Sequence, residues 1–190
     1  VLFLVLLFHA FVPAADAATG AEGATSTGEL SEKLAKLHMP FIENKGQVDD
    51  RQVAYYARTL GGTCYVSAKG QISYALPQAA GNGQGTVKGV IVTESLVGAR
   101  TAAAKGITAS STKVSFFRGR DPGQWRSDVR TYDQVSLGEV YPGIDLELKA
   151  AGNNVEKVFS VNPGGDVGAI QILLSGGRSR SWSVNRFSRR

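Results

Sequence analysis

Two carboxylates, Asp145 and Glu147, lie two residues apart in a stretch that alternates apolar and charged residues. Such alternation is typical of a β-strand with one buried face, and it puts both carboxylates on the other face, roughly 7 Å apart. Two acids at this spacing could serve an inverting glycoside hydrolase as general acid and general base. Because Lys149 continues the same row, the alternative is a solvated polar face. We expect the solvated face, with no catalytic residue, and keep the hydrolase as an alternative.

Other residue types that support catalysis are sparse. If residues 1–17 are removed, as argued below, His38 is the single remaining histidine, which excludes a zinc site with two histidine ligands in this chain. Cys64 is the single cysteine, so no internal disulfide can form. Its alternation with Val66 and Ala68 predicts a buried, inert thiol. We expect His38 at the surface rather than in a nucleophile pair.

Two turns rich in side-chain oxygens, at residues 49–50 and 153–154, could contact calcium, but neither has the D-x-D-x-D-G pattern of a calcium loop. The glycine-rich stretch at residues 81–85 lacks the Lys-Ser/Thr ending of a phosphate-binding loop. We therefore predict no cofactor and no metal site.

Aromatic residues recur in the apolar runs, where most are expected to form core contacts or cross-strand pairs. An exposed row of Trp125, Tyr132 and Tyr141 would instead favour a carbohydrate-binding module. The aromatic residues considered are Tyr55, Tyr56, Tyr65, Tyr74, Phe116, Phe117, Trp125, Tyr132 and Tyr141.

The elements that must position these residues are strands and turns. Alternation over Ile144 to Lys149, turn residues at 151–154 and a second alternating run over Val155 to Val161 predict a β-hairpin. Similar short runs recur at intervals of ~8–12 residues. The prediction is an all-β fold, an antiparallel β-sandwich or open barrel of roughly 8–11 short strands, with one short N-terminal helix over Glu29 to His38.

Two further expectations concern the second half of the chain. The polar, small-residue stretch from Gly98 to Ser111 predicts a surface loop. The apolar stretch from Ala169 to Leu174 predicts a last strand that turns Ile170, Ile172 and Leu174 inward.

The ends of the chain differ in composition from its middle. The apolar run from Val1 to Val12 is shorter than the ~20 residues of a membrane span, and an Ala-x-Ala site follows at 15–17. We predict a signal peptide at 1–17, with an uncleaved anchor as the alternative. It would be followed by a flexible linker at 18–28 and a β-rich domain at 29–175. The chain would then end in a basic tail at 176–190, which is either disordered or the mark of a truncated protein.

The net charge of +5 does not indicate a nucleic-acid-binding protein. Five arginines follow residue 177 without any acid, and the rest of the chain carries 16 basic and 16 acidic residues. A neutral body gives no basic footprint for DNA or RNA.

Several segments occur in the same order in one protein family. They are FIENKGQ at 41–47, the Tyr-Ala-Arg-Thr and Gly-Gly-Thr run at 56–63, FFRGRDPGQW at 116–125, VYPGIDLELKAAGNNVEKVFSV at 140–161 and NPGGDVGAI at 162–170. From about residue 41 to 175 the chain resembles the uncharacterised N-terminal β-domain of secreted bacterial proteins that carry SBBP-type β-propeller repeats. The resemblance implies an extracytoplasmic β-domain ahead of a propeller, and it assigns no catalytic residue.

The combined expectation is a secreted or cell-surface module with a structural or adhesive role, not an enzyme and without a membrane span once the signal peptide is removed. Its expected partners are a downstream β-propeller in longer relatives, or surface glycans or proteins. A carbohydrate-binding module is the alternative, and a glycoside hydrolase using Asp145 and Glu147 is the third reading.

Overall fold

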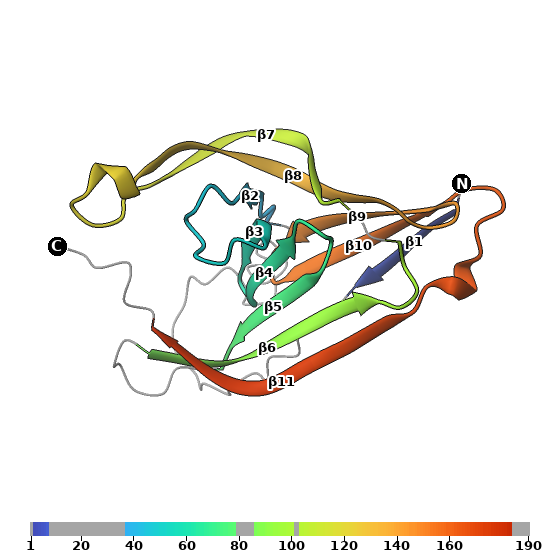
Figure 1. Cartoon of the computed structure of the whole chain (residues 1–190). Helices are drawn as coiled ribbons and strands as arrows, with labels where there is room; N and C mark the ends of the chain where they lie inside the picture. Colours follow the sequence, from blue (N-terminus) through green and yellow to red (C-terminus); the bar gives the residue numbers. More distant parts are fainter. Residues whose placement is uncertain (1, 8–36, 79–85, 101–102, 184–190) are drawn as a thin grey trace, which may run out of the picture.

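The computed structural model describes residues 2–7, 37–78, 86–100 and 103–183. In this part of the chain eleven strands form one curled antiparallel sheet (Figure 1). This confirms the predicted all-β antiparallel class. The curl gives an open half-barrel, so of the two predicted architectures the open barrel is the closer.

The strands are short near the start of the domain and long near its end. They are β1 (Leu2–Leu7), β2 (Phe41–Glu43), β3 (Val53–Thr59), β4 (Gly62–Ser67), β5 (Ile72–Pro77), β6 (Thr86–Leu96), β7 (Lys105–Phe116), β8 (Arg126–Tyr141), β9 (Ile144–Ala151), β10 (Asn154–Val161) and β11 (Ile172–Ser183). Two single 3-10 turns, η1 (Pro122–Gln124) and η2 (Val167–Ala169), lie between strands.

The strand order is β1-β10-β9-β8-β2-β3-β4-β5-β6-β11, and β7 pairs with β8 outside this path. Hydrogen-bonded neighbours are mostly consecutive in sequence, as in a meander. The curl brings the inner faces of β10 and β6 together. The contact that shows this joins Lys157 Nζ of β10 to Glu94 Oε2 of β6 at 2.9 Å.

The β9–β10 hairpin forms as predicted, with a continuous register from Ile144↔Val161 to Ala151↔Asn154. Ile144, Leu146 and Leu148 point inward and are fully buried. Gly152 in the connecting turn has a φ of +55°, a left-handed conformation that glycine adopts without steric cost.

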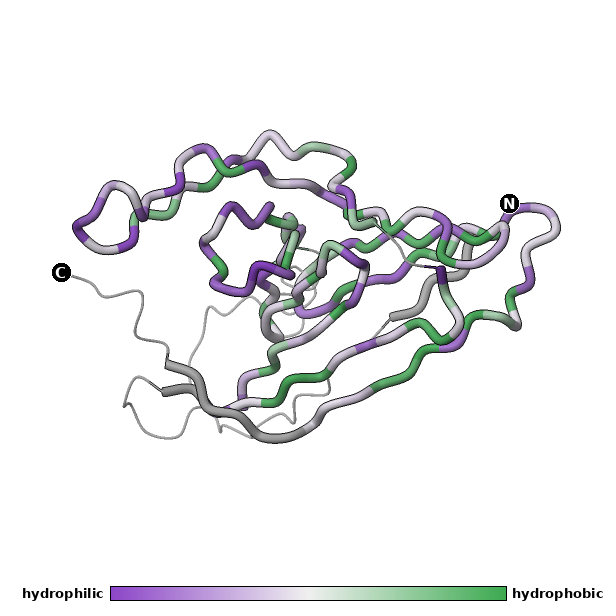
Figure 2. Tube along the Cα trace, viewed as in Figure 1, coloured by the Kyte–Doolittle hydropathy of each residue, from purple (hydrophilic) through white to green (hydrophobic). Residues whose placement is uncertain are grey.

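The main core lies inside the curl and combines residues from both halves of the sheet. Apolar residues of β4 and β5 pack in one cluster with those of β8, β9 and β10. A smaller second cluster joins Ile42, Tyr56 and Val129. Hydrophobic stretches also run along β6 and β11, at one end of the sheet (Figure 2).

Three local expectations differ from the structure. Residues 105–111, predicted as loop, belong to β7, because β8 supplies a hydrogen-bonding partner that polar residues can use as well as apolar ones. Leu37 and His38 are not helical, and His38 forms an isolated bridge with Ala151; the rest of the predicted helix, 29–36, lies outside the described residues.

The last strand also differs from the prediction. β11 starts at Ile172 and extends to Ser183, so the predicted tail boundary at 175 falls inside a strand that pairs with β6. Leu174, expected to face inward, is 51% exposed. β11 is the last strand in the sheet order, and within the described sheet it pairs with β6 alone.

At the other end of the order, residues 2–7 form β1 against β10. Removal of residues 1–17 stays a prediction. The predicted linker lies outside the described residues. Within the described ranges no helix combines the length and apolar character that a membrane crossing requires.

Candidate functional site

The carboxylates of Asp145 and Glu147 lie on the outer face of β9, both partly exposed. Asp145 stands opposite Ser160 of β10 and Glu139 of β8, and its Oδ2 accepts a 3.4 Å hydrogen bond from Asn162 Nδ2. Neither carboxylate lines the cleft described below. Their surroundings are those of a solvated strand face.

The three aromatic residues proposed as a sugar platform do not form a row. Trp125 is 39% exposed, but Tyr132 is half-buried and packs edge-on against Tyr55 at 5.7 Å between ring centroids. Tyr141 is buried, and its hydroxyl donates to the carbonyl oxygen of Val97 at 3.0 Å. Only Trp125 of the three presents an open ring.

The other residues singled out from the sequence are spread over the domain. His38 is exposed, with Nε2 3.0 Å from Oδ1 of Asp133. Asp50 Oδ1 accepts the backbone N–H of Gln52 at 2.8 Å, and Asp49 contacts Arg118, so both oxygen-bearing side chains have protein partners. No cluster of three or more His, Cys, Asp or Glu side chains suited to a metal occurs among the described residues.

A charged pair that the sequence reading missed lies inside the sheet. Lys157 Nζ is 2.9 Å from Glu94 Oε2, and both side chains are 3% exposed. The Tyr74 hydroxyl donates to the same carboxylate oxygen at 3.3 Å, and the lysine ammonium lies 5.5 Å from the centre of the Tyr74 ring. The cluster links β10, β6 and β5 across the interior.

Burial dominates the titration of the groups beside this pair. It raises the pKa of the Cys64 thiol to about 12, against a smaller lowering effect of Lys157. It also raises the pKa of Tyr74 above its ordinary value, and the neighbouring Cys64 and Glu94 raise it further. Cys64 is therefore a buried, protonated thiol, as its alternation predicted.

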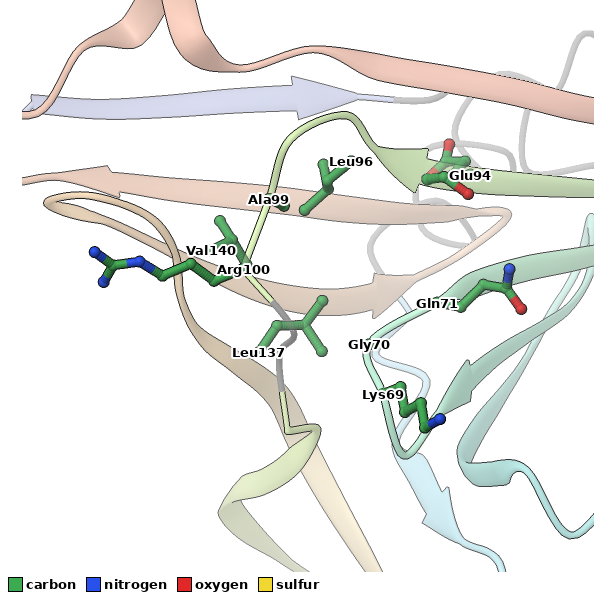
Figure 3. Close-up of a pocket in the computed structure, with 10 residues that line it drawn as sticks. Lys69, Gly70, Gln71, Glu94, Leu96, Ala99, Arg100, Leu137 and Val140 are labelled. Atoms are coloured by element: carbon green, nitrogen blue, oxygen red, sulfur yellow. The ribbon is translucent and has the colours of Figure 1, made fainter.

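A cleft of about 270 Å³ opens beside the charged pair. Figure 3 shows its lining, which comes from the turn before β5, the end of β6 and the inward side of β8. Arg100 points away from the other lining residues, and its guanidinium contacts Glu139. The lining residues are Lys69, Gly70, Gln71, Glu94, Ser95, Leu96, Ala99, Arg100, Leu137 and Val140.

The cleft combines apolar side chains such as Leu137 and Val140 with polar ones. Its carboxylate, Glu94, is buried and contacts Lys157 and the Tyr74 hydroxyl. Loss of one partner from a buried ion pair leaves an uncompensated charge, so the contacts of Glu94 bear first on the fold.

Two sequence motifs far apart in the chain meet at one end of the sheet. Arg118 Nη2 donates to the Gln47 carbonyl oxygen at 2.7 Å, and Arg126 Nε donates to the Lys45 carbonyl oxygen at 2.7 Å. Gly46, with a φ of +101°, lies so close that an added Cβ would stand 3.5 Å from the Arg126 guanidinium. The NKGQ loop thus braces the tip of the β7–β8 hairpin.

The side chain of Asn44 organises that loop from within. Its amide nitrogen donates to the carbonyl oxygens of Val48, Asp50 and Val53, and its oxygen accepts the backbone N–H groups of Gly46 and Val48. An Asx-type network of this kind fixes a loop that has no ladder bonds of its own.

The braced tip, residues 117–126, presents two open aromatic rings. Phe117 is 66% exposed and packs edge-on against Trp125 with 5.4 Å between ring centroids. Trp125 Nε1 donates to the Gly119 carbonyl oxygen at 3.3 Å, and Asp121 Oδ1 accepts the Gly123 N–H at 2.9 Å. Figure 1 shows the tip, with η1, at the far end of the long β7–β8 ribbon.

The fold and the braced tip define a single-sheet, all-β domain that carries two exposed aromatic rings at one end. The chain belongs to the family described as Domain of unknown function (DUF7948), whose profile matches residues 41–185. No curated protein and no solved structure matches the chain with significance.

One of these features, the buried charge, could have been found from sequence. Lys157 occupies an inward position in the alternation of Val155, Phe159 and Val161, which is a signal for a buried charge that needs a partner. The partner, Glu94, interrupts the alternation of Val92 and Leu96 in β6 in the same way, but neither pattern identifies the other residue as its partner. The meeting of the NKGQ loop with the hairpin tip depends on long-range topology, which neither motif carries alone.

Proposed function

We propose that this domain is a non-catalytic, extracytoplasmic module with a structural or adhesive role, located ahead of β-propeller repeats in longer proteins. The resemblance at the NKGQ and YPGID segments supports the association with repeats. The apolar run followed by Ala-x-Ala at 15–17 supports export.

The observation that carries the proposal is the open Phe117–Trp125 pair on a braced hairpin tip. Protein contact surfaces are enriched in aromatic residues and arginine, and a surface that is ordered before binding loses less conformational entropy. Hydrogen bonds from Arg118 and Arg126 to the NKGQ loop provide that order. The tip is therefore the surface we expect to contact the neighbouring repeats or another surface protein.

Carbohydrate binding is the second candidate, and the same pair favours it, because exposed aromatic rings can stack on sugars. The rings meet edge-on, at 89°, so they do not form one flat platform. This geometry suits a polypeptide contact better than a flat sugar chain.

The experiment compares wild type with the double variant Phe117→Ala, Trp125→Ala. Purified protein is tested by surface plasmon resonance against a β-propeller repeat protein taken from a longer member of the family, and on a glycan array. The control variant is Leu60→Ala, which removes an apolar side chain at the β3–β4 turn whose exposure, 55%, lies between those of Phe117 and Trp125. Thermal unfolding of each variant checks that the fold persists.

Binding to the propeller, weakened about tenfold or more in the double variant and unchanged in the control, supports the proposal. Glycan binding that is lost with Trp125 supports the second candidate. Wild-type protein that binds neither probe contradicts both.

A further inference from the structure

The side of β10 that faces away from β9 is paired along its length with one more strand. That strand is Leu2–Leu7, with an antiparallel register from Leu2↔Val161 to Leu7↔Glu156. The proposed function includes export with removal of residues 1–17. The exported chain would then keep β10 in the sheet through β9 but lose the strand on its other side.

One hydrogen bond shows which backbone amides of β10 face away from β9 and would meet such a strand. Asn162 donates its N–H to the Gly143 carbonyl oxygen at 2.8 Å, which continues the β9–β10 register. Amides along a strand point alternately to its two sides. Those of Lys157, Phe159 and Val161 therefore point away from β9, toward the position of β1.

The interior beneath this edge needs a cover. Phe159 is fully buried and Val161 is 7% exposed, and the Lys157–Glu94 pair lies between β10 and β6. An open edge would admit water to this pair and leave a row of backbone amides without partners. An uncharged apolar strand satisfies the amides and keeps the interior dry.

We propose that the open edge of β10 is a strand-acceptor site, which binds an extended, uncharged apolar strand of another polypeptide in the place of Leu2–Leu7. The inference rests on the proposed function, since the edge opens only in the processed chain. Residues 18–36 and 184–190 contain no run of six uncharged apolar residues, so the mature chain offers no replacement from these segments. Strand addition to an exposed sheet edge is a known mode of peptide recognition.

The test uses the protein recovered after export, whose intact mass reports whether residues 1–17 are absent. The probe is a synthetic peptide with the sequence of residues 2–7 and a lysine tail for solubility. Two matched peptides carry backbone N-methyl groups. In one they lie at Leu4 and Leu6, which pair with Phe159 and Lys157 and whose backbone amides face β10. In the other they lie at Phe3 and Val5, whose backbone amides face away from β10.

Amide hydrogen exchange at single-residue resolution gives the result. The unmodified peptide and the one methylated at Phe3 and Val5 should slow exchange at Lys157, Phe159 and Val161 by about tenfold or more. The peptide methylated at Leu4 and Leu6 should have no effect, because it cannot donate to β10.

Equal effects of all three peptides would show hydrophobic adsorption and overturn the inference. So would a processed chain that binds no peptide, or one whose β10 amides are already protected through self-association, read from sedimentation at increasing concentration. A recovered chain that retains residues 1–17 contradicts the export step of the proposed function instead, and the mass distinguishes the two failures.

Discussion

The β9–β10 hairpin and the β6–β11 ribbon are both antiparallel pairs rich in apolar residues, yet their burial is opposite. Ile144, Leu146 and Leu148 are fully buried, whereas Leu173 and Leu174 are 57% and 51% exposed. Adjacent residues of a strand point to opposite faces, so β11 is open on both. The same kind of strand is thus core in one place and surface in the other.

The difference comes from the position of each ribbon in the curl. The inner face of β9–β10 packs against β4 and β5 across the interior, in one core cluster. β11 is the last strand of the order and has a neighbour only in β6 within the described sheet. Apolar content therefore predicts strands in this domain, but curvature decides which of them are buried.

The largest expected effect is at the charged pair under the hairpin. Lys157→Met leaves Glu94 buried without its cation, which should lower the free energy of unfolding by about 3–5 kcal/mol. Urea unfolding measures the loss. The control is Lys149→Met on the outer face of β9, which should change stability by less than about 0.5 kcal/mol.

The double variant Lys157→Met, Glu94→Gln should recover part of that loss, because the uncompensated charge is gone. If Lys157→Met is no more costly than Lys149→Met, the pair does not link β10 to β6.

The next largest effect is expected when a leucine is replaced by alanine in each of the two ribbons. Leu148→Ala should cost about 2–5 kcal/mol, since it opens a cavity in the core. Leu174→Ala should cost less than about 1 kcal/mol, since that side chain already meets solvent. Denaturant midpoints with unchanged slopes would report the two values. Similar costs would mean that β11 is covered in solution and would remove the contrast.

A smaller effect concerns pH. Burial raises the pKa of Cys64 to about 12, from an ordinary value of 9.0, so the folded chain keeps a proton that the unfolded chain releases. This contribution to stability is complete below about pH 9 and declines as the pH rises toward 12, because the unfolded state binds fewer protons there. Between neutral pH and about pH 10, wild type should lose more stability than Cys64→Ala.

The thiol gives an independent check. Iodoacetamide should leave Cys64 unmodified in the folded protein and alkylate it in urea, as read from intact mass. Rapid alkylation of the folded protein would show that the interior between β4 and β10 is open.

The smallest effect is expected on the outer face of the hairpin. Asp145→Asn and Glu147→Gln should each change the free energy of unfolding by less than about 0.5 kcal/mol, because both carboxylates are solvated. A larger stabilisation by either substitution would show that the two charges repel one another along the outer face of β9, and would revive the reading of the pair as an acid–base site.

The sequence was informative wherever a local pattern decides the structure. The β9–β10 hairpin and its inward face followed from the alternation at Ile144 to Leu148 and from the turn residues, and the burial of Cys64 followed from its neighbours. The partners of Lys157 and Arg118 could not be predicted from a local pattern, since Glu94 and Gln47 lie far away in sequence and are brought close only by the fold. The exposure of Leu174 was missed for the same reason.

The most direct test of this account is residue-resolved hydrogen exchange of the whole chain under native conditions. Amides of β9 should exchange only through global unfolding, with protection at least about a hundredfold above that of β11, which should open locally. Equal protection of β9 and β11 would contradict this contrast, because β11 would then be as closed as the core hairpin although Leu173 and Leu174 are exposed.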